Sequence, residues 1–378
     1  MHVACVSYFY DRFLDSPEAL LERYETLTGW VEGLAAAGAE VTVVQRFAGD
    51  AEIARNGVLY MFVRDPAWRF GSLPDMARQV NRAVARLRPD IVHIHGMGFA
   101  RQAWWLRRLL PTTPLLLQDH AGSPPTRWMN RRTLRLALES VDAVSFTVPE
   151  QARPWIEAGI LRADKPLVEL PEGSSPFRLR SRAEARAYTG LTGDPLCLWV
   201  GRLNANKDPL TVLRGFARTL ACLPTARLAM VYSAEDLLPA VQAWLAANPA
   251  AASRVRLLGC LPHAELEAIY NSADFFLLGS DYDGGSGYSV LEALSCGVVP
   301  IITDIPSFRA ALRNGEYGGL WPVGNAEALA DTLLAWHRRL QPGTQQRQRD
   351  YFEQHLSFEA IGRQALATYD RLLRGTRP

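Results

Sequence analysis

The sequence predicts an α/β protein built from two doubly wound, Rossmann-like domains. Short β-branched runs alternate with helical patterns along most of the 378 residues, which favours parallel strands joined by helices. The chain is too long for one ordinary core and suits two domains of roughly 150 to 200 residues each. A stretch rich in Pro, Gly, Ser and charge, from Pro171 to Pro195, has the composition of a connection. We therefore expect two sheets that face each other across a cleft.

The first half of the chain carries six patterns typical of buried strands, at the spacing of an α/β domain. Ser16 followed by Pro17 predicts the start of a helix that runs to Gly38, because serine caps helix N-termini and proline fits the first turn. We assign residues 1–177 to this domain and 178–195 to the linker. The expected strands are residues 2–10, 39–47, 57–63, 89–96, 113–120 and 141–148.

The alternation restarts in residues 196–345, which we assign to a second domain of the same class. The last segment, 346–378, has an amphipathic helical pattern, and we expect it to pack back on the first domain. The expected strands of the second domain are residues 196–201, 226–232, 254–259, 273–279 and 298–303.

The composition is that of a globular protein whose default partner is not nucleic acid. Apolar residues make up 48% and the net charge is +2, far from the charge-rich signature of disorder. The chain starts in a strand pattern and has no run of about twenty apolar residues, so we expect a cytoplasmic protein. Five cysteines are scattered singly without a C-x-x-C pair, so we expect reduced core residues rather than disulfides or a zinc site.

The stretch SDYDGGSGYSVLEALSCG, residues 280–297, joins an apolar strand to a helix that we expect from Ser289 to Cys296. In an open α/β sheet this turn lies at the carboxyl ends of the strands, where ligands bind. Glycines let a ligand approach the backbone, and the free N–H groups of a helix start favour an anion such as phosphate. Two simpler interpretations stay open: a tight surface turn, and a capping box in which Glu292 only satisfies the helix start.

A second cluster, VGRLNANKDPL, places Arg202 and Lys207 on the loop after the first strand of the second domain. Two cations at that sheet edge would clamp a diphosphate, one through a guanidinium fork and one as a point charge. Lys207 is one of only two lysines in the chain, the other being Lys165. An exposed basic loop without a ligand is the alternative.

Together these motifs resemble a known family. VGRLNANKDPLTVLRGF, LLGCLPHAELEAIYNSADFFLLGS and GGSGYSVLEALSCGVVPIIT resemble the nucleotide-sugar-binding domain of GT-B retaining glycosyltransferases, in the glycogen synthase-like group 1 of family 4. PDIVHIHG and LQDHAG resemble strand ends of that family's N-terminal acceptor domain. The resemblance implies the GT-B fold over nearly the whole chain.

The resemblance also implies roles for individual residues. Arg202 and Lys207 match the positions that hold the donor diphosphate, Glu292 the position that binds the ribose, and His120 the histidine that reaches the donor sugar across the cleft. A strand-end histidine paired with a neighbour such as Asp119 is the structural alternative for His120. The implied donor-binding set is Glu292, Gly285, Ser286, Gly287, Tyr288, Ser289, Val290, Asp283 and Gly259.

The sequence departs from the family pattern in two places. A glutamate is expected eight residues before Glu292, but Gly284 stands there and Asp283 is one position away. The first loop, SYFYDRFLDS, lacks the paired glycines usual in the family, and we assign Tyr8, Tyr10 and Arg12 to a modified acceptor edge.

The resemblance implies transfer of a sugar from a nucleoside-diphosphate sugar to an acceptor hydroxyl, on a glycan, a lipid-linked molecule or a small molecule. Two fixed cations and helix-start amides would stabilise the departing diphosphate, so neither a metal nor another cofactor is expected. Two alternatives stay open: a nucleotide-sugar epimerase, and a nucleotide-binding protein of this fold that has lost catalysis.

Residues 101–135 contain seven arginines against one acid, Asp119, with tryptophan and leucine between them. Arginine and aromatic side chains on one face would rest on an anionic membrane, where lipid-linked acceptors are found. We therefore expect peripheral contact with the inner face of a membrane. In the alternative interpretation, helices in this region pack Trp104 and Leu109 onto the sheet.

Overall fold

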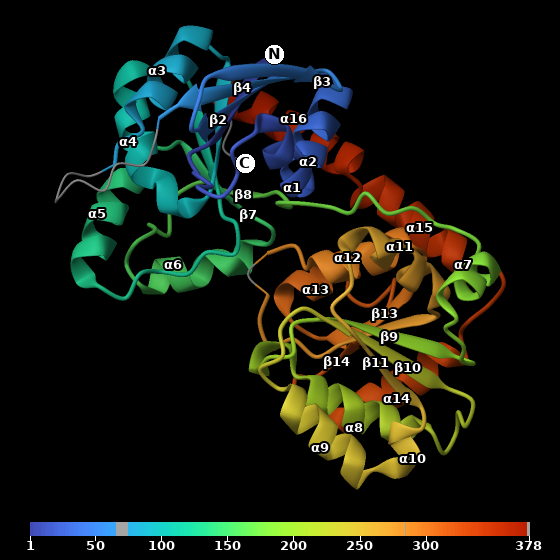
Figure 1. Cartoon of the computed structure of the whole chain (residues 1–378). Helices are drawn as coiled ribbons and strands as arrows, with labels where there is room; N and C mark the ends of the chain where they lie inside the picture. Colours follow the sequence, from blue (N-terminus) through green and yellow to red (C-terminus); the bar gives the residue numbers. More distant parts are fainter. Residues whose placement is uncertain (66–74, 284, 376–378) are drawn as a thin grey trace. The chain divides into compact units, whose positions relative to one another are not determined.

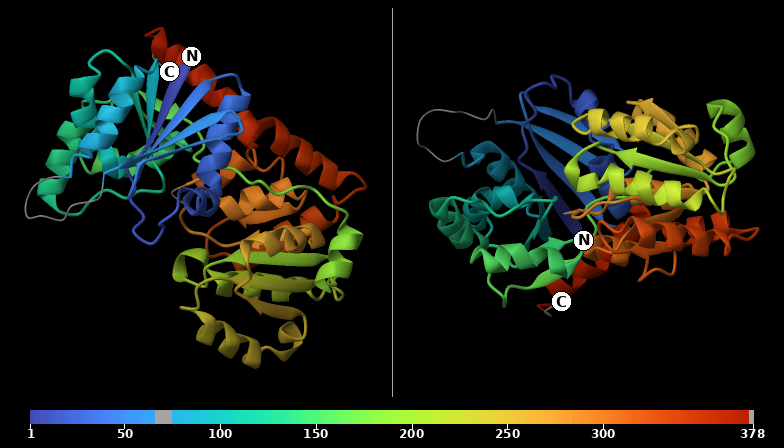
Figure 2. Two further views of the ribbon diagram at one scale, coloured as in Figure 1. Left: turned by 45° about the horizontal axis from the view of Figure 1, so that its top comes forward. Right: turned by 90° about the horizontal axis from the view of Figure 1, so that it is seen from below.

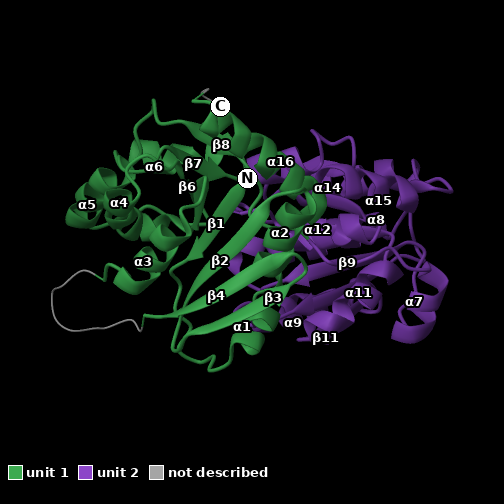
Figure 3. Ribbon diagram, turned by 90° about the horizontal axis from the view of Figure 1, so that it is seen from above, with its two compact units in different colours: residues 1–174, 358–378 green, residues 175–357 purple. Residues whose placement is uncertain are grey.

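A computed structural model of the chain describes residues 1–65, 75–283 and 285–375. The chain forms two compact units: unit 1 is Met1–Ser174 with Phe358–Pro378, and unit 2 is Ser175–Ser357 (Figures 1 and 3). Each unit contains one sheet with helices on both faces (Figure 2). The expected pair of doubly wound α/β domains is therefore confirmed.

Unit 1 contains an eight-stranded sheet. Its strands are β1 (His2–Ser7), β2 (Glu40–Phe47), β3 (Ala51–Arg55), β4 (Val58–Arg64), β5 (Ile91–His95), β6 (Leu115–Gln118), β7 (Ala143–Phe146) and β8 (Leu167–Glu169). Their order is β3-β4-β2-β1-β5-β6-β7-β8, and within the described residues every pairing is parallel except that of β3 with β4.

The core of unit 1 has two halves, one on each face of the sheet. Along β1, Ala4 and Val6 point into one half, and Val3 and Cys5 into the other, as the pleat of a strand requires. Helices α3, α4 and α5 cover the first face, and α2 and α16 cover the second. The helices of unit 1 are α1 (Pro17–Arg23), α2 (Glu25–Ala36), α3 (Arg78–Leu87), η1 (Met97–Phe99), α4 (Ala100–Leu109), α5 (Trp128–Leu138), η2 (Pro149–Ala152), α6 (Arg153–Glu157) and α16 (Phe358–Leu373).

The first helical region differs from the expected single helix. Ser16 caps α1 as expected, because its hydroxyl accepts a hydrogen bond from Ala19 N at 3.1 Å. The helix then breaks at Tyr24, which has φ −108° and ψ 51°, and α2 starts at the next residue. A tyrosine gives no sequence signal for such a break.

Helix α16 packs on α2 through glycines. A Cβ atom on Gly362 would lie 2.2 Å from the carbonyl oxygen of Gly33, and one on Gly33 would lie 2.3 Å from that of Phe358. Only residues without a side chain allow the two backbones to approach this closely. The last helix of the chain is thereby part of unit 1.

Unit 2 contains a six-stranded sheet in which all described pairings are parallel. Its strands are β9 (Leu196–Gly201), β10 (Arg227–Tyr232), β11 (Val255–Gly259), β12 (Phe275–Leu278), β13 (Val299–Thr303) and β14 (Gly319–Trp321), in the order β11-β10-β9-β12-β13-β14. The helices are α7 (Arg182–Thr189), η3 (Ala205–Lys207), α8 (Pro209–Thr219), α9 (Leu238–Ala247), α10 (Pro249–Ala252), α11 (His263–Ser272), α12 (Tyr288–Ser295), α13 (Pro306–Ala311), α14 (Ala326–His337) and α15 (Thr344–His355).

Every strand expected from the sequence overlaps an observed strand, but the division of the chain differs from the expected one. Residues 178–195, expected as a linker, include α7 and belong to unit 2. The expected C-terminal segment is two helices, of which α15 belongs to unit 2 and only α16 to unit 1. The expectation of core cysteines is also wrong in part: Cys222 and Cys260 are exposed.

Candidate donor and acceptor sites

The candidate donor site lies where the strand order of unit 2 reverses. The chain passes from β9 to β10 and β11 on one side, and then returns to place β12 on the other side of β9. The loops that leave the carboxyl ends of β9 and β12 diverge at such a point, and open α/β sheets bind ligands there. These two loops carry the two clusters singled out in the sequence.

The loop after β9 is fixed by its own side chains. The Asn204 side chain accepts a hydrogen bond from the backbone N–H of Lys207 at 3.1 Å. Asp208, in the left-handed conformation at φ 37°, accepts one from Thr211 N at 3.2 Å and so caps α8. Lys207 is thus held between two capped turns.

The loops after β9 and β12 are joined to each other. Asn206 donates from its side chain to Asp281 Oδ1 at 2.6 Å and to the carbonyl of Tyr282 at 2.8 Å. Lys207 Nζ lies 3.3 Å from Asp283 Oδ2, and both side chains are largely buried. The structure therefore brings the predicted diphosphate cluster and the predicted glycine turn together.

Arg202 differs from Lys207 in its surroundings. Its side chain is exposed, and within the part of the chain that the structure describes its guanidinium has no hydrogen-bond or ion-pair partner. A guanidinium with five unused donors can bind phosphate oxygens through two parallel hydrogen bonds.

Helix α12 begins one residue earlier than expected, at Tyr288, with Gly287 as its N-cap. No side chain caps it, so the capping-box interpretation of Ser289 and Glu292 is wrong. Gly287 has φ 67°, and a Cβ atom there would lie 2.8 Å from Cε1 of Phe308. The turn at this position therefore requires glycine.

Glu292 has a partner that the sequence does not reveal. Its carboxylate Oε1 lies 2.8 Å from Nε2 of His263, the first residue of α11, and only 12% of the Glu292 side chain is exposed. His263 also stacks on Phe177, with 4.9 Å between ring centroids. The sequence does not reveal this contact, because only the packing of α11 and α12 brings the two residues together.

The other predicted donor-binding residues occupy the same edge of the sheet. Gly285, Ser286 and Val290 are buried, Ser289 is half-buried, and Tyr288 is exposed. Gly259 ends β11 with φ 74° and open space where a Cβ atom would be. Gly284, the departure from the family pattern, lies outside the described residues.

In unit 1, His120 follows β6 and contacts two polar side chains. Its Nε2 lies 3.1 Å from Nδ1 of His95, and its Nδ1 lies 3.4 Å from Oε2 of the buried Glu172. The neighbouring side chains that pair with His120 are therefore His95 and Glu172 rather than Asp119, whose two carboxylate oxygens accept from Gly122 N at 3.2 Å. A third of the His120 side chain is exposed, yet its dense surroundings lower its pKa to about 4.

His120 contacts, edge-to-face, a stack of two buried histidines on β5. The rings of His93 and His95 lie 4.5 Å apart and nearly parallel, and His93 Nδ1 lies 2.6 Å from the hydroxyl of Tyr369 on α16. Burial lowers the pKa of His93 to about 3 and that of His95 well below its usual value. The alternation in HIH places both rings on one face of a strand, which is the signal that could have identified the stack.

A cavity of about 490 Å³ opens beside His120, at the carboxyl ends of β5 and β6. Asp119 and Trp155 line it, with Arg101 and Gln102 of α4 and Asn130 of α5 among the other lining residues. Burial raises the pKa of Asp119 to about 6.

The predicted acceptor edge is distributed over core and surface. Tyr8 is buried and donates its hydroxyl to Asn81 Oδ1 at 2.6 Å. Tyr10 is half-buried, and the exposed Arg12 lies over the Phe13 ring at 4.7 Å. Of the three, Tyr8 is joined through Asn81 to the carbonyl of Gln102, beside the cavity.

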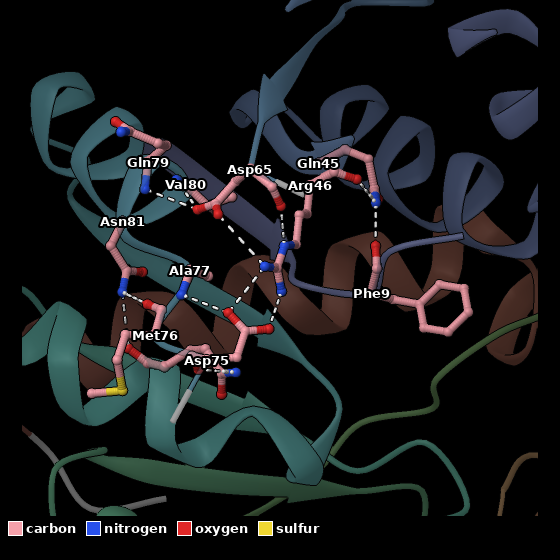
Figure 4. A network of polar contacts seen from close by, with 11 residues as sticks. Phe9, Gln45, Arg46, Asp65, Asp75, Met76, Ala77, Gln79, Val80 and Asn81 are labelled. Carbon is pink, nitrogen blue, oxygen red and sulfur yellow. Dashed lines mark hydrogen bonds and ion pairs between the residues drawn. The ribbon is translucent and has the colours of Figure 1, made fainter. Parts of the chain in front are cut away.

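A buried arginine, Arg46, holds Asp75, which is one of the residues that line this cavity. Figure 4 shows the polar contacts of Arg46. Arg46 is 3% exposed and makes two hydrogen bonds to the carboxylate of Asp75, at 2.5 and 3.0 Å. It also donates to the carbonyl of Asp65 at 2.5 Å. Asp75 lines the cavity and is fixed there by this bidentate pair.

Within the described ranges, no group of three or more His, Cys, Asp and Glu side chains is arranged to hold a metal ion. No described helix combines the length and apolar character needed to cross a membrane.

Two family models match the chain. The one described as Glycosyl transferase 4-like domain covers residues 25–169, and the one described as Glycosyl transferases group 1 covers residues 194–338. A phosphatidyl-myo-inositol mannosyltransferase of Mycobacterium leprae is 25% identical over 65% of this chain. A GDP-mannose:cellobiosyl-diphosphopolyprenol alpha-mannosyltransferase of Xanthomonas campestris is 26% identical, also over 65%. The matched regions span 63% and 64% of those relatives' own lengths.

Solved structures share the fold. Sucrose-phosphate synthase from Thermosynechococcus elongatus superposes with a TM-score of 0.66 at 20% identity, over 99% of this chain and 100% of that one. Anabaena HepE in complex with UDP and glucose gives a TM-score of 0.66 at 15% identity, over 98% of this chain and 99% of that one. With two matching family models and this shared architecture, the chain belongs to the GT4-type glycosyltransferases of the GT-B fold.

Proposed function

We propose that this protein transfers a sugar from a nucleoside-diphosphate-sugar donor to an acceptor hydroxyl. The observation that carries the proposal is the joining of the β9 and β12 loops, which places Lys207 against Asp283 of the loop after β12, at the switch point of the sheet. The names of the relatives support it, since both are mannosyltransferases.

The leaving group is the nucleoside diphosphate, whose charge grows as the bond to the sugar breaks. Arg202 and Lys207 supply two positive charges, and in this proposal the N-terminal turn of α12, which begins after Gly287, supplies the partial positive charge of a helix start. Because Asp283 and the capped turns already fix Lys207, little reorganisation accompanies the developing charge. These protein groups carry the stabilisation in our proposal, without a metal or another cofactor.

Glu292 accepts the ribose hydroxyls in this proposal, and His263 orients the carboxylate for that task. We assign Gly259 and the backbone of 285–290 to the remaining donor contacts, with Asp283 next to the diphosphate. His120 is assigned to the donor sugar, and Tyr8, Tyr10 and Arg12 to the acceptor edge. Retention of the anomeric configuration rests on the family resemblance.

The acceptor in this proposal is a lipid-linked molecule or glycan, and the protein works at the cytoplasmic face of a membrane. The relatives' names support an acceptor of this kind, since one contains phosphatidyl-myo-inositol and the other a diphosphopolyprenol. The nucleobase and the sugar stay open, because one relative is named for GDP-mannose and a similar solved structure is a complex with UDP-glucose.

Thermal shift with UDP, GDP and ADP sugars tests the donor, because a ligand that binds only the folded state raises its stability. The selected donor is then incubated with membrane lipid extract, and the products are analysed. A sugar found on a lipid or glycan supports transfer. Rearranged sugar nucleotide without acceptor would identify an epimerase, and binding without turnover a protein that has lost catalysis.

A further inference from the structure

Helices α4 and α5 pack against each other in unit 1 (Figures 1 and 3). Both helices expose large apolar side chains. Among the described residues twelve large apolar side chains are exposed, and five of them lie on these two helices. Trp104 and Leu109 are 37% and 43% exposed, so the interpretation that packs them onto the sheet is wrong. We call the following residues the α4–α5 face: Trp104, Arg108, Leu109, Trp128, Met129, Arg132, Arg135 and Leu136.

The apolar side chains of α5 gather on one side of the helix. Five residues of α5 lie on a single helical face, because the last four follow the first by one, four, seven and eight positions. These residues are Trp128, Met129, Arg132, Arg135 and Leu136. Leu134, Ala137 and Leu138 occupy the opposite side and are buried in the core of unit 1. Helix α5 therefore buries one apolar face in the core of unit 1 and exposes a second apolar face to solvent.

The charged residues of the α4–α5 face are all arginines, and the neighbouring acid Glu139, at the C-cap of α5, lies 3.7 Å from Arg162. Neither α4 nor α5 contains an acidic residue. Arg132 and Arg135 are exposed, and over the described ranges their guanidinium groups make no hydrogen bond or ion pair. Arg108 lies over the Trp104 ring at 4.0 Å. Arg107, in contrast, is bound to carbonyl oxygens and to Asp142, and is a structural residue.

This combination fits a lipid surface better than a nucleic acid. Both partners attract arginine, and both accept aromatic rings. Leu109, Met129 and Leu136 add exposed aliphatic surface, which gains nothing from phosphates or bases but is buried at the boundary between head groups and acyl chains. The exposed aliphatic residues therefore favour a lipid surface over a nucleic acid as the partner.

The same two helices line the cavity beside His120. Arg101 and Gln102 of α4, and Asn130 and Leu134 of α5, form part of its wall. Gln102 is 8% exposed, and its Oε1 has no partner, whereas its Nε2 donates to the Asp75 carbonyl at 2.9 Å. A buried acceptor without a partner costs free energy unless a ligand donates to it, and a hydroxyl supplies such a donor.

Resting on the proposed function, we propose that the α4–α5 face docks on an anionic phospholipid membrane and that the adjoining cavity receives the hydroxyl-bearing head group of the acceptor. The arginines bind lipid phosphates, the tryptophans lie at head-group depth, and the aliphatic residues enter the acyl boundary. Gln102 Oε1 and the Asp119 carboxylate then accept hydrogen bonds from head-group hydroxyls, and Arg101 faces an anionic group.

Flotation of the full chain with vesicles tests the docking face. We expect binding to vesicles of phosphatidylcholine with phosphatidylglycerol at low salt, and much weaker binding to phosphatidylcholine alone or at high salt. Arg132→Gln/Arg135→Gln is expected to weaken binding at least tenfold. Arg82→Gln/Arg86→Gln on α3 is the matched control, because it removes the same charge from another exposed helix of unit 1.

A second pair of variants tests the apolar residues. Trp128→Ser/Leu136→Ser is expected to lower vesicle binding at least fivefold, whereas Tyr188→Ser, which changes a 76% exposed ring on α7, leaves it unchanged. Circular dichroism checks that each variant folds. The docking face is overturned if the parent does not float at low salt, if the arginine variant floats like its control, or if a single-stranded oligonucleotide binds while vesicles do not.

Sugar transfer separates this inference from the proposed function. With the donor selected by thermal shift, Arg132→Gln/Arg135→Gln is expected to bind donor like the parent but to transfer at least fivefold less sugar to vesicle-borne lipid extract. Gln102→Leu is expected to float like the parent and to lose transfer to a similar extent. If no donor binds the parent, the proposed function fails, while flotation still decides the docking face. Unchanged transfer by Gln102→Leu would mean that the cavity does not receive the head group of the acceptor.

Discussion

Glu292 Oε1 lies 2.8 Å from Nε2 of His263, and this contact joins α12 to α11 at the edge of the candidate donor site. The carboxylate is largely buried, while half of the histidine side chain is exposed. Because the N-cap of α12 is Gly287 and Glu292 is the fifth residue of the helix, the carboxylate has no capping role to perform. The helix start therefore does not account for the position of this carboxylate.

Replacing Glu292 by glutamine therefore tests the ribose role directly. The amide keeps one acceptor oxygen and loses the charge that strengthens both hydrogen bonds to the ribose. We expect Glu292→Gln to fold normally and to bind the nucleotide sugar at least tenfold more weakly, measured by calorimetric titration. Glu265→Gln, an exposed change on α11, is the control. Parental affinity in Glu292→Gln would remove the residue from the donor site.

The diphosphate clamp is tested with Arg202→Ala and Lys207→Ala. Each change removes a charge-assisted contact worth roughly 1.5–3 kcal/mol, so donor turnover should fall about ten- to a hundredfold. The melting temperature should change little for Arg202, whose guanidinium has no partner over the described ranges. Arg214→Ala, an exposed change on α8, is expected to keep parental turnover. If both clamp variants turn over donor like the parent, the clamp is misplaced.

The sequence predicted the strands well because buried parallel strands are nearly continuous apolar runs, as in LCLWVG, which matches β9. It missed β8 and β14, which have three residues each, and β3, whose sequence AEIAR is half polar. Such short or edge strands depend on their neighbours for pairing. The local sequence of such a strand does not show which neighbouring strand it pairs with.

The candidate donor site was predictable where its residues are close in sequence and unpredictable where packing brings them together. Arg202 and Lys207 share one loop, and the glycine turn precedes its helix directly. The partner of Glu292 is twenty-nine positions away on another helix, and nothing in HAELEAIY marks His263 as that partner. Tyr8 was expected at an acceptor edge, but only the folded chain shows its hydroxyl on Asn81.

Gly362 tests the close approach of α16 to α2. A Cβ atom at this position would lie 2.2 Å from the carbonyl oxygen of Gly33, so Gly362→Ala forces the two helices apart. We expect a loss of about 1–3 kcal/mol in the free energy of unfolding, as for other overpacked sites. Urea denaturation measures it, and Gly49→Ala, which meets open space, is the control. A Gly362→Ala variant as stable as this control would contradict the packing described here.

The histidine stack makes unit 1 sensitive to acid. Histidine in an unfolded chain has a pKa of about 6.5, whereas burial lowers the pKa of His93 to about 3 and that of His120 to about 4 in the fold. Below about pH 6.5 the unfolded state therefore binds more protons than the native state, and stability falls as the pH falls. Asp119 acts in the opposite direction between about pH 6 and 4, because burial raises its pKa to about 6 and the native state takes up its proton first.

Replacing His93 by glutamine measures the contribution of this one residue to the pH dependence of stability. His93 is fully buried, so between pH 6 and 4 it should contribute up to about 1.4 kcal/mol per pH unit to the slope of unfolding free energy against pH. Glutamine does not titrate and retains a polar atom for the hydroxyl of Tyr369, so His93→Gln should show a shallower slope, by about that amount. Urea denaturation at several pH values measures both slopes, with His355→Gln, an exposed change on α15, as the control. Equal slopes in His93→Gln and the parent would mean that His93 is already protonated in the native state, and the stack would then be a cationic rather than a neutral element of unit 1.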